Sequence, residues 1–336
     1  MFIIDSNIVF YLISDKKVVK VSKKTISLER LKVLLEKAKD NIAITNISIL
    51  EIIFHFNNDF ISLNKAFDVL RKNRIKIINY PNYNFPKFRN YRLIREYIRD
   101  EKGVDSMSSW IYVKAEMEAS FIAIYYLLLN TAYFCLNIDN EQKLEESLFK
   151  TNIKKFLTEI TLSCKNKLRT LIVTAYLQGD KEAFSKCRRL IKNELKNTLG
   201  LIVNCFINDE SAKERELCLL QKCVTNSSKN PLQLLSNKYN RLNLEKKKDL
   251  LARIANIVGL VEDFDQLLSE YFLYIFKKML DTNYIPTKND ILDGAITTMI
   301  TNGAVLVTGD ETINNFILSQ SDERFSENKT FINNIN

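Results

Sequence analysis

The sequence predicts an α/β protein in which a parallel-sheet domain is interrupted by a large all-α insertion. Short apolar runs alternate with helical patterns over roughly the first 80 residues. From about residue 87 to 280 the apolar residues recur at helical spacing, and after Pro286 the alternation returns. Alternating strands and helices are typical of a mostly parallel sheet. The expected boundaries are residues 1–85 and 285–336 for a discontinuous α/β domain and 86–284 for the helical insertion.

The first part of the chain predicts strands from its short apolar runs and helices from amphipathic spacing. The expected strands are Phe2–Ile4, Asn41–Ile44 and Arg74–Ile78. The expected helices are Ile8–Ile13, Ser27–Asp40, Ile47–Phe56 and Asp59–Asn73. Ser6 or Asn7 is expected to cap the first helix and Thr45 or Asn46 the third, because such side chains accept hydrogen bonds from free amides. Lys16–Lys24 is expected to be a basic loop.

The middle of the chain predicts helices throughout, and the end predicts strands again. The middle helices are expected near Trp110–Leu136, Asp249–Leu280, Leu168–Leu177 and Leu190–Phe206, with a loop at Asn226–Pro231. The last part is expected to form a helix at Asp290–Thr301, a turn at Gly303, a strand at Ala304–Val307 and an edge strand at Thr330–Ile332.

The composition limits the kinds of partner and of metal site. A formal charge of +9 favours a polyanionic partner, with nucleic acid ahead of a membrane surface. Six cysteines without a C-x-x-C pair indicate free thiols, mostly buried, in a reducing cytosol. With His55 as the single histidine, a zinc site has no support. No secretory signal precedes Asp5, so a cytoplasmic location is expected.

One segment, Phe121–Ile138, carries no charge and is long enough to cross a bilayer. Asn130 and Thr131 interrupt it, acidic residues lie on both sides, and no Lys/Arg bias would orient it. A buried or dimer-forming helix is therefore favoured over a membrane span.

Four carboxylates occupy strand ends and helix starts near the two ends of the chain: Asp5, Glu51, Asp293 and Asp310. In a parallel sheet such positions meet at one edge, where doubly wound folds form their crevice. Carboxylates gathered there without basic partners repel one another, so the pattern indicates a site for a hard cation. The simpler alternative is that each Asp only caps the helix that follows and that Glu51 is a solvated surface residue.

These residues lie in four short motifs that together resemble the PIN-domain ribonucleases. The motifs are Ile3-Ile4-Asp5-Ser6-Asn7, Thr45-Asn46-Ile47-Ser48-Ile49-Leu50-Glu51, Asp293-Gly294-Ala295-Ile296 and Gly303-Ala304-Val305-Leu306-Val307-Thr308-Gly309-Asp310. The resemblance covers about residues 1–80 and 285–336. The long gap between the second and third motifs departs from small family members and bears on substrate access.

The resemblance implies Mg²⁺- or Mn²⁺-dependent cleavage of RNA, or sometimes of structured DNA. Asp5 and Asp310 would be the primary metal ligands, and Glu51 and Asp293 would complete the cluster directly or through water. Three further residues would support them, with Asn7 and Thr308 orienting carboxylates or water and Asp290 facing the same crevice one turn before Asp293. A protein inhibitor or a homodimer through the helical insertion is a further possible partner.

A basic segment at the start of the insertion is a candidate nucleic-acid surface. Its cations are Lys87, Arg89, Arg92, Arg95 and Arg99. They would neutralise phosphates, while the interleaved Phe88, Tyr91 and Tyr97 could stack unpaired bases. The alternative is a solvated basic face with its aromatics turned into the core. His55 shares a helical face with Glu51 and could touch substrate or water, although such a residue is more often a packed or partly exposed bystander.

Two other function classes compete with a metal-dependent endoribonuclease. One is a catalytically silent nucleic-acid-binding scaffold whose helical insertion recruits a partner. The other is a phosphatase-like enzyme with Asp5 as nucleophile. Such enzymes usually carry a second Asp two positions later, where this chain has Asn7.

Overall fold

The computed structural model describes residues 1–14, 16–38, 40–56, 59–79, 87–92, 94, 106–137, 147–178, 196–205, 207, 209–225, 231–258, 266–282, 284, 286, 289–300 and 303–335. The chain divides into two compact units. An α/β unit comprises Met1–Ser106 with Leu292–Asn336, and a helical unit comprises Met107–Ile291. Arg95 and Arg99 lie outside the described residues.

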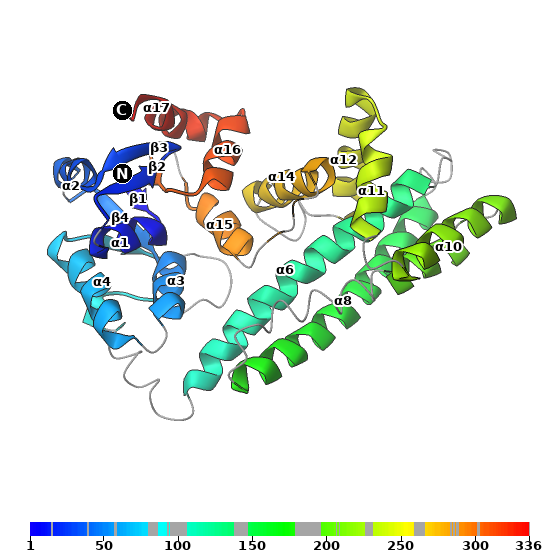
Figure 1. The fold of residues 1–336 in the computed structure, drawn as a ribbon, viewed down its shortest axis with the longest axis horizontal. Coiled ribbons are helices and arrows are strands. Elements are labelled where there is room, and N and C mark those ends of the chain that lie inside the picture. The colour runs from blue at the N-terminus through cyan, green and yellow to red at the C-terminus, as the bar shows by residue number, and fades with distance from the viewer. Residues whose placement is uncertain are drawn as a thin grey trace. The chain divides into compact units, whose positions relative to one another are not determined.

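A four-stranded parallel sheet forms the centre of the α/β unit (Figure 1). Its order is β5 (Lys76–Ile78), β4 (Ile42–Thr45), β1 (Phe2–Ile4) and β6 (Val305–Val307). Ile4 pairs with Ile44 on one side and with Val307 on the other. The chain therefore leaves β4, β1 and β6 at the same edge of the sheet. The parallel-sheet prediction is confirmed.

Helices follow the strands of this unit, as the alternation predicts. They are α1 (Ser6–Ile13), α2 (Leu28–Lys37), α3 (Asn46–Phe56), α4 (Phe60–Lys72), α15 (Asn289–Thr297), α16 (Glu311–Ser319), the 3₁₀ helix η1 (Glu323–Phe325) and α17 (Ser326–Asn334). Helices α1, α3 and α4 pack on one another, and α17 packs against both β6 and α16. Ser27 and Asp59 cap α2 and α4 through their side chains, which fixes where those helices begin.

The expected basic loop at Lys16–Lys24 is wrong, because this segment contributes to an antiparallel hairpin of β2 (Val18–Val21) and β3 (Lys24–Ser27). Val19 and Val21 are buried while Lys20 is exposed, so the segment alternates with the period of a strand. Ser22 and Lys23 have φ angles of 46° and 71°, the left-handed turn that joins tight hairpins. The interspersed lysines obscured this alternation.

Two expectations at the strand ends are also corrected. The N-cap of α1 is Asp5, whose carboxylate accepts from the Ser6 amide, rather than Ser6 or Asn7. Thr330–Ile332 belongs to α17 and is not an edge strand. The edge of β6 is instead closed by Asn328, which accepts from the Leu306 amide and donates to the Ala304 carbonyl. A buried amide side chain thus substitutes for a neighbouring strand.

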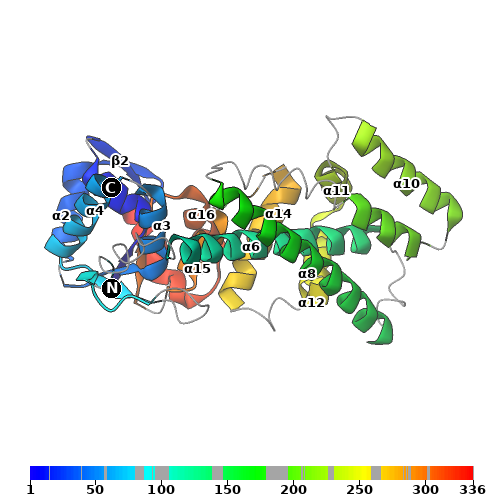
Figure 2. The same cartoon turned by 90° about the horizontal axis from the view of Figure 1, so that it is seen from below.

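Helices make up all the secondary structure described in the second unit, as predicted. They are α6 (Ser106–Asn137, which starts at the unit boundary), α8 (Ser147–Leu177), residues 196–205, α10 (Glu210–Thr225), α11 (Pro231–Asn240), α12 (Leu244–Val258) and α14 (Gln266–Thr282). Helices α6 and α8 run alongside each other in Figure 1 and cross in the view of Figure 2, and ion pairs from Glu116 to Lys165 and Arg169 join them. Of the loop expected at Asn226–Pro231, residues 226–230 lie outside the described residues and Pro231 begins α11.

The apolar segment of α6 is the core of this unit. Among the described residues one stretch, Glu118–Asn137, is long and apolar enough to cross a membrane, and 78% of its most apolar window is buried within the structure. Its Tyr126 hydroxyl hydrogen-bonds to the Thr198 hydroxyl. Burial of this kind is typical of the central helix of a helical bundle.

The cysteines are less uniform than expected, since Cys135 and Cys164 are buried but Cys205 and Cys218 are exposed.

Candidate metal centre

The Asp5 carboxylate lies buried where β1 ends and α1 begins. Its Oδ1 accepts from the Ser6 amide at 2.6 Å. Its Oδ2 accepts from Asn7 Nδ2 at 2.5 Å and from the Thr308 hydroxyl at 2.7 Å. Both oxygens are therefore held in a fixed orientation by neutral donors.

Thr308 joins the two ends of the chain at this point. Besides donating to Asp5, its hydroxyl accepts from Asn7 Nδ2 and from the Asp310 amide, both at 3.0 Å. Asn7 Oδ1 accepts from the Gly309 amide at 3.0 Å. The loop after β6 is thus tied to the start of α1 by a continuous hydrogen-bond network. The structure brings Asn7 and Thr308 together around Asp5 as orienting groups.

Asp310 lies in the same loop and begins α16. Its Oδ1 accepts from the Thr312 and Ile313 amides at 2.6 and 3.0 Å, so it is a helix N-cap. Its charge also acts on its neighbours, because it raises the pKa of both Asp5 and Glu51. The capping interpretation of Asp310 is therefore correct but incomplete, since the same carboxylate also forms a group of neighbouring acids, the acidic cluster, with Asp5 and Glu51.

Glu51 reaches the cluster from α3. Although the residue as a whole is partly accessible, its Oε2 is buried and has no hydrogen-bond partner among the described residues. Burial, followed by the charge of Asp5, raises the pKa of this carboxyl to about 8, against a smaller opposing effect of the Ser6 hydroxyl. A buried carboxylate oxygen without a hydrogen-bond partner lowers the stability of the folded protein. A positively charged group bound beside Glu51 would offset this cost.

No Lys or Arg among the described residues supplies this positive charge. Burial raises the pKa of Asp5 to about 6, and the charge of Asp310 adds to it. The opposing effects come from hydrogen bonds of Thr308 and Ser6, and no Lys or Arg is among them. Asp5, Glu51 and Asp310, here called the acidic cluster, therefore form a like-charged group held together without a basic partner in the described residues.

Tyr11 and Gly309 belong to this site and were missed in the sequence. Burial raises the pKa of the Tyr11 phenol, Lys20 lowers it, and Asp5 and Asp310 raise it further. A Cβ on Gly309 would lie 2.9 Å from the Tyr11 hydroxyl and 2.6 Å from the Lys20 carbonyl oxygen. Gly309 is thus required so that Tyr11 and the β2–β3 hairpin can pack against the loop. The sequence motif Thr308-Gly309-Asp310 was interpreted through Thr308 and Asp310, and the requirement for its glycine was missed.

The other predicted acids are placed differently. Asp293, in α15 of the α/β unit, is buried, but among the described residues it is not one of the charges that shift Asp5 or Glu51. Asp290 lies one turn earlier within the helical unit and accepts from the Tyr284 hydroxyl at 2.9 and 3.0 Å. In the described part of the chain, no three His, Cys, Asp or Glu side chains converge into a ready-made metal cage.

The predicted basic segment is described at three of its five cations. Lys87, Arg89 and Arg92 are exposed. The aromatics between them turn inward, since Phe88 is buried and the Tyr91 hydroxyl donates to the Ile75 carbonyl at 2.6 Å. The expected stacking role of these two aromatics is therefore wrong, while the cations remain available to solvent.

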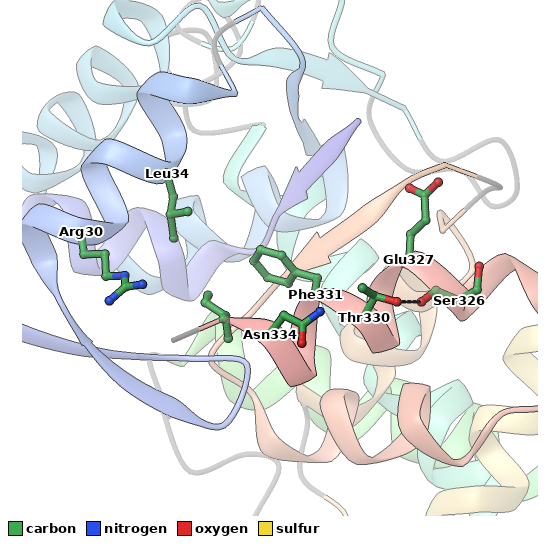
Figure 3. A pocket seen from close by; sticks show the side chains of 8 residues that line it. Arg30, Leu34, Ser326, Glu327, Thr330, Phe331 and Asn334 are labelled. Carbon is green, nitrogen blue, oxygen red and sulfur yellow. Dashed lines mark hydrogen bonds between the residues drawn. The ribbon is translucent and has the colours of Figure 1, made fainter.

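A groove elsewhere on the α/β unit has no link to the acidic cluster. It encloses roughly 470 Å³ between α2 and α17 (Figure 3). Its lining residues are Arg30, Leu34, Ser326, Glu327, Thr330, Phe331, Asn334 and Ile335. None of the predicted site residues is among them, so the chemistry of this protein is argued from the acidic cluster.

Comparison of the chain with protein-family models, with curated proteins and with solved structures finds no match.

Proposed function

We propose that this protein is a divalent-metal-dependent nuclease of PIN-like type that hydrolyses phosphodiester bonds, with RNA as its preferred polymer. The observation that supports this most directly is the buried Oε2 of Glu51, which has no hydrogen-bond partner among the described residues and lies beside two further carboxylates. Among the described residues no basic side chain compensates these charges. A bound cation is the simplest group that would make the acidic cluster favourable.

The donor set fits Mg²⁺ or Mn²⁺. Both ions prefer oxygen ligands, and Mg²⁺ usually keeps several waters and binds through one or two carboxylates rather than a full protein cage. Asp5 and Asp310 would be the primary ligands of the ion. Glu51 would complete the site directly or through water, since the three carboxylates do not converge into a ready-made cage among the described residues. When bound, the ion would lower the pKa of a water and neutralise charge on the scissile phosphate.

The chain's own residues prepare this site before any ion binds. Asn7 and Thr308 fix both the position and the orientation of the Asp5 carboxylate. The amides at the start of α16 fix Asp310 in the same way. Tyr11, held against Gly309, places a phenol beside the cluster, where it can donate a hydrogen bond to a phosphate oxygen. Such preorganisation is what electrostatic catalysis requires.

Two features support nucleic acid as the substrate. The net charge of +9 favours a polyanion, and Lys87, Arg89 and Arg92 present exposed cations on the α/β unit. The order and placement of the four acidic motifs resemble the PIN-domain ribonucleases, which favours RNA over DNA.

The test is cleavage of end-labelled single-stranded RNA and DNA with Mn²⁺, Mg²⁺ or EDTA, comparing the wild-type protein with Asp5→Asn. We expect cutting only with metal, strongest on RNA, and reduced at least about 100-fold in Asp5→Asn. Asn keeps an oxygen for the Ser6 amide, so α1 remains capped.

Asp59→Asn is the matched control, because Asp59 also caps a helix of the same unit but lies exposed at the start of α4. It should cut at the wild-type rate. If Asp5→Asn cuts as fast as Asp59→Asn, the acidic cluster is not the catalytic site. If the folded wild-type protein binds RNA but cuts no substrate with either metal, the scaffold alternative is favoured.

A further inference from the structure

Three aromatic rings form a cluster between α1 and α3, close to the acidic residues. Phe10 and His55 have ring centroids 4.3 Å apart with planes inclined by 34°. Phe56 meets both rings nearly edge-on, with centroids 5.6 Å from Phe10 and 4.9 Å from His55. The rings thus order one another, as aromatic pairs in offset and edge-to-face arrangements do. This group is called the aromatic cluster below.

The aromatic cluster differs from the core aromatics in its access to solvent. Phe67 and Phe316, in the same unit, are buried almost completely. His55 is exposed, and Phe10 and Phe56 are only partly buried. An aromatic group that served the core alone would gain by complete burial. Three rings in mutual contact, one of them exposed, offer an aromatic face on which a further ring could stack.

The helices that carry these rings also carry two of the catalytic candidates. Glu51 and His55 are four residues apart on α3, so they lie on one face of the helix, roughly 6 Å apart along its axis. Phe10 lies on α1, which Asp5 caps. The aromatic cluster is therefore carried by the same two helices that position Asp5 and Glu51.

We propose that the aromatic cluster is a stacking surface for an unpaired base next to the phosphodiester bond that is cut, which makes single-stranded nucleic acid, or a looped-out base, the substrate class. Stacking on aromatic rings tolerates any base, because every base presents a π-face. A base inside a duplex has both faces covered and cannot use this surface. The proposal rests on the proposed nuclease function for its position, but its binding step needs neither metal nor cleavage.

The experiment measures binding of wild-type protein, in EDTA, to a single-stranded RNA containing one 2-aminopurine, whose fluorescence falls when it stacks. His55→Leu removes the exposed ring while keeping an apolar side chain, and His55→Tyr restores an aromatic ring. We expect His55→Leu to weaken binding by at least about fivefold and to reduce the quenching, and His55→Tyr to restore both. Phe10→Leu should act like His55→Leu, with folding checked by circular dichroism melting.

Tyr112→Leu is the matched control, because Tyr112 is an exposed aromatic residue of the helical unit. It should bind as the wild type does. A fully paired duplex should bind with little quenching. Binding and quenching that are unchanged in both His55→Leu and Phe10→Leu would overturn the proposal, as would a wild-type protein that does not bind the single strand.

The two proposals fail separately in this design. Metal-dependent cleavage that requires Asp5, together with unchanged binding by His55→Leu, removes the stacking surface and leaves the nuclease. Quenching that depends on His55, in a protein that cuts nothing, leaves the stacking surface and removes the nuclease. When both hold, His55→Leu should raise KM for single-stranded RNA more than it lowers kcat.

Discussion

Two carboxylates of the helical unit are paired with lysine or arginine, whereas the acidic cluster of the α/β unit has no such partner among the described residues. In the helical unit, Glu216 accepts from Lys238 Nζ at 2.6 Å and from the Tyr133 hydroxyl at 2.7 Å. Glu116 is paired in the same unit with Lys165 at 2.6 Å and Arg169 at 3.4 Å. In the acidic cluster, hydroxyl and amide groups supply every described hydrogen bond to Asp5.

The difference appears in the pKa values. Burial alone would raise the pKa of Glu116, but Lys165 and Arg169 reverse the effect and hold it below its usual value. Burial raises the pKa of Glu51 to about 8, and the nearby acids add to the increase. In the helical unit, a carboxylate beside a cation contributes to a contact between helices. A buried carboxylate without a cation costs stability, which makes it a candidate for a functional site.

The largest difference between the acidic cluster and the paired carboxylates of the helical unit should be in catalysis. Glu51→Gln should lower metal-dependent RNA cleavage at least about 100-fold, because it removes a metal ligand from the acidic cluster. Glu216→Gln should leave cleavage unchanged, because Glu216 belongs to a contact between helices. Single-turnover rates with Mn²⁺ measure both. Equal loss in the two variants would indicate that unfolding, not the site, explains the effect.

The second effect should be on folding stability, and it should come from the ion pair of the helical unit. Lys238→Met leaves Glu216 mostly buried and without its cation, since the Glu216 side chain is 15% exposed. We expect the free energy of unfolding to fall by about 1–3 kcal/mol, with or without metal. Urea unfolding followed by circular dichroism measures it. A change under about 0.5 kcal/mol would mean that Lys238 and Glu216 interact as a surface pair does.

The third effect is a gain of stability in Glu51→Gln, and its size should depend on pH. The folded protein holds the protons of Asp5 and Glu51 up to about pH 6 and 8, whereas the unfolded chain releases them near 3.8 and 4.5. Stability from this source is complete below about pH 4 and is lost as the pH rises through the folded pKa values. In EDTA at pH 8, Glu51→Gln should therefore be more stable than wild type by about 1–2 kcal/mol.

Two controls sharpen this third prediction. At pH 5 the advantage of Glu51→Gln should shrink, because wild-type Glu51 is then neutral in the folded protein. Adding Mn²⁺ at pH 8 should raise the melting temperature of wild type and have less effect on the variant. A wild-type protein whose stability in EDTA is the same at pH 5 and pH 8 would contradict the assigned burial of these acids.

Much of the α/β unit could be predicted because its strands are short apolar runs followed at once by capping residues. Topology then requires that Asp5 and Thr308 meet at one sheet edge, since Ile4 pairs directly with Val307. The hairpin was missed because its lysines obscure the alternation of Val19 and Val21. Local propensity misled at Thr330–Ile332, where Asn328 fixes a helix against β6.

The candidate site was predictable as a list of acids with two supporting residues, Asn7 and Thr308, which do lie around Asp5. That Glu51 has a buried oxygen without a partner depends on how α3 packs against α1, which a sequence does not specify. Tyr11 and Gly309 depend on a close approach between segments about 300 residues apart. The same limit applies to Phe88 and Tyr91, whose ring directions decide between core and surface. Spacing names candidate residues, and packing decides which of them face one another.

The smallest effect should come from the acid next to the cluster in the sequence. Glu311 follows Asp310 directly, but its side chain is 63% exposed and it pairs with Lys20 at 3.0 Å. Exposed pairs contribute little, so Glu311→Gln should change stability by no more than about 0.5 kcal/mol and leave RNA cleavage within about twofold of wild type. Urea unfolding and cleavage rates, measured beside Asp310→Asn, give the comparison. The acidic cluster is distinguished by burial without a cation among the described residues, a property that the adjacent Glu311 lacks. A large loss of RNA cleavage in Glu311→Gln would therefore show that position in the loop, and not this burial, determines activity.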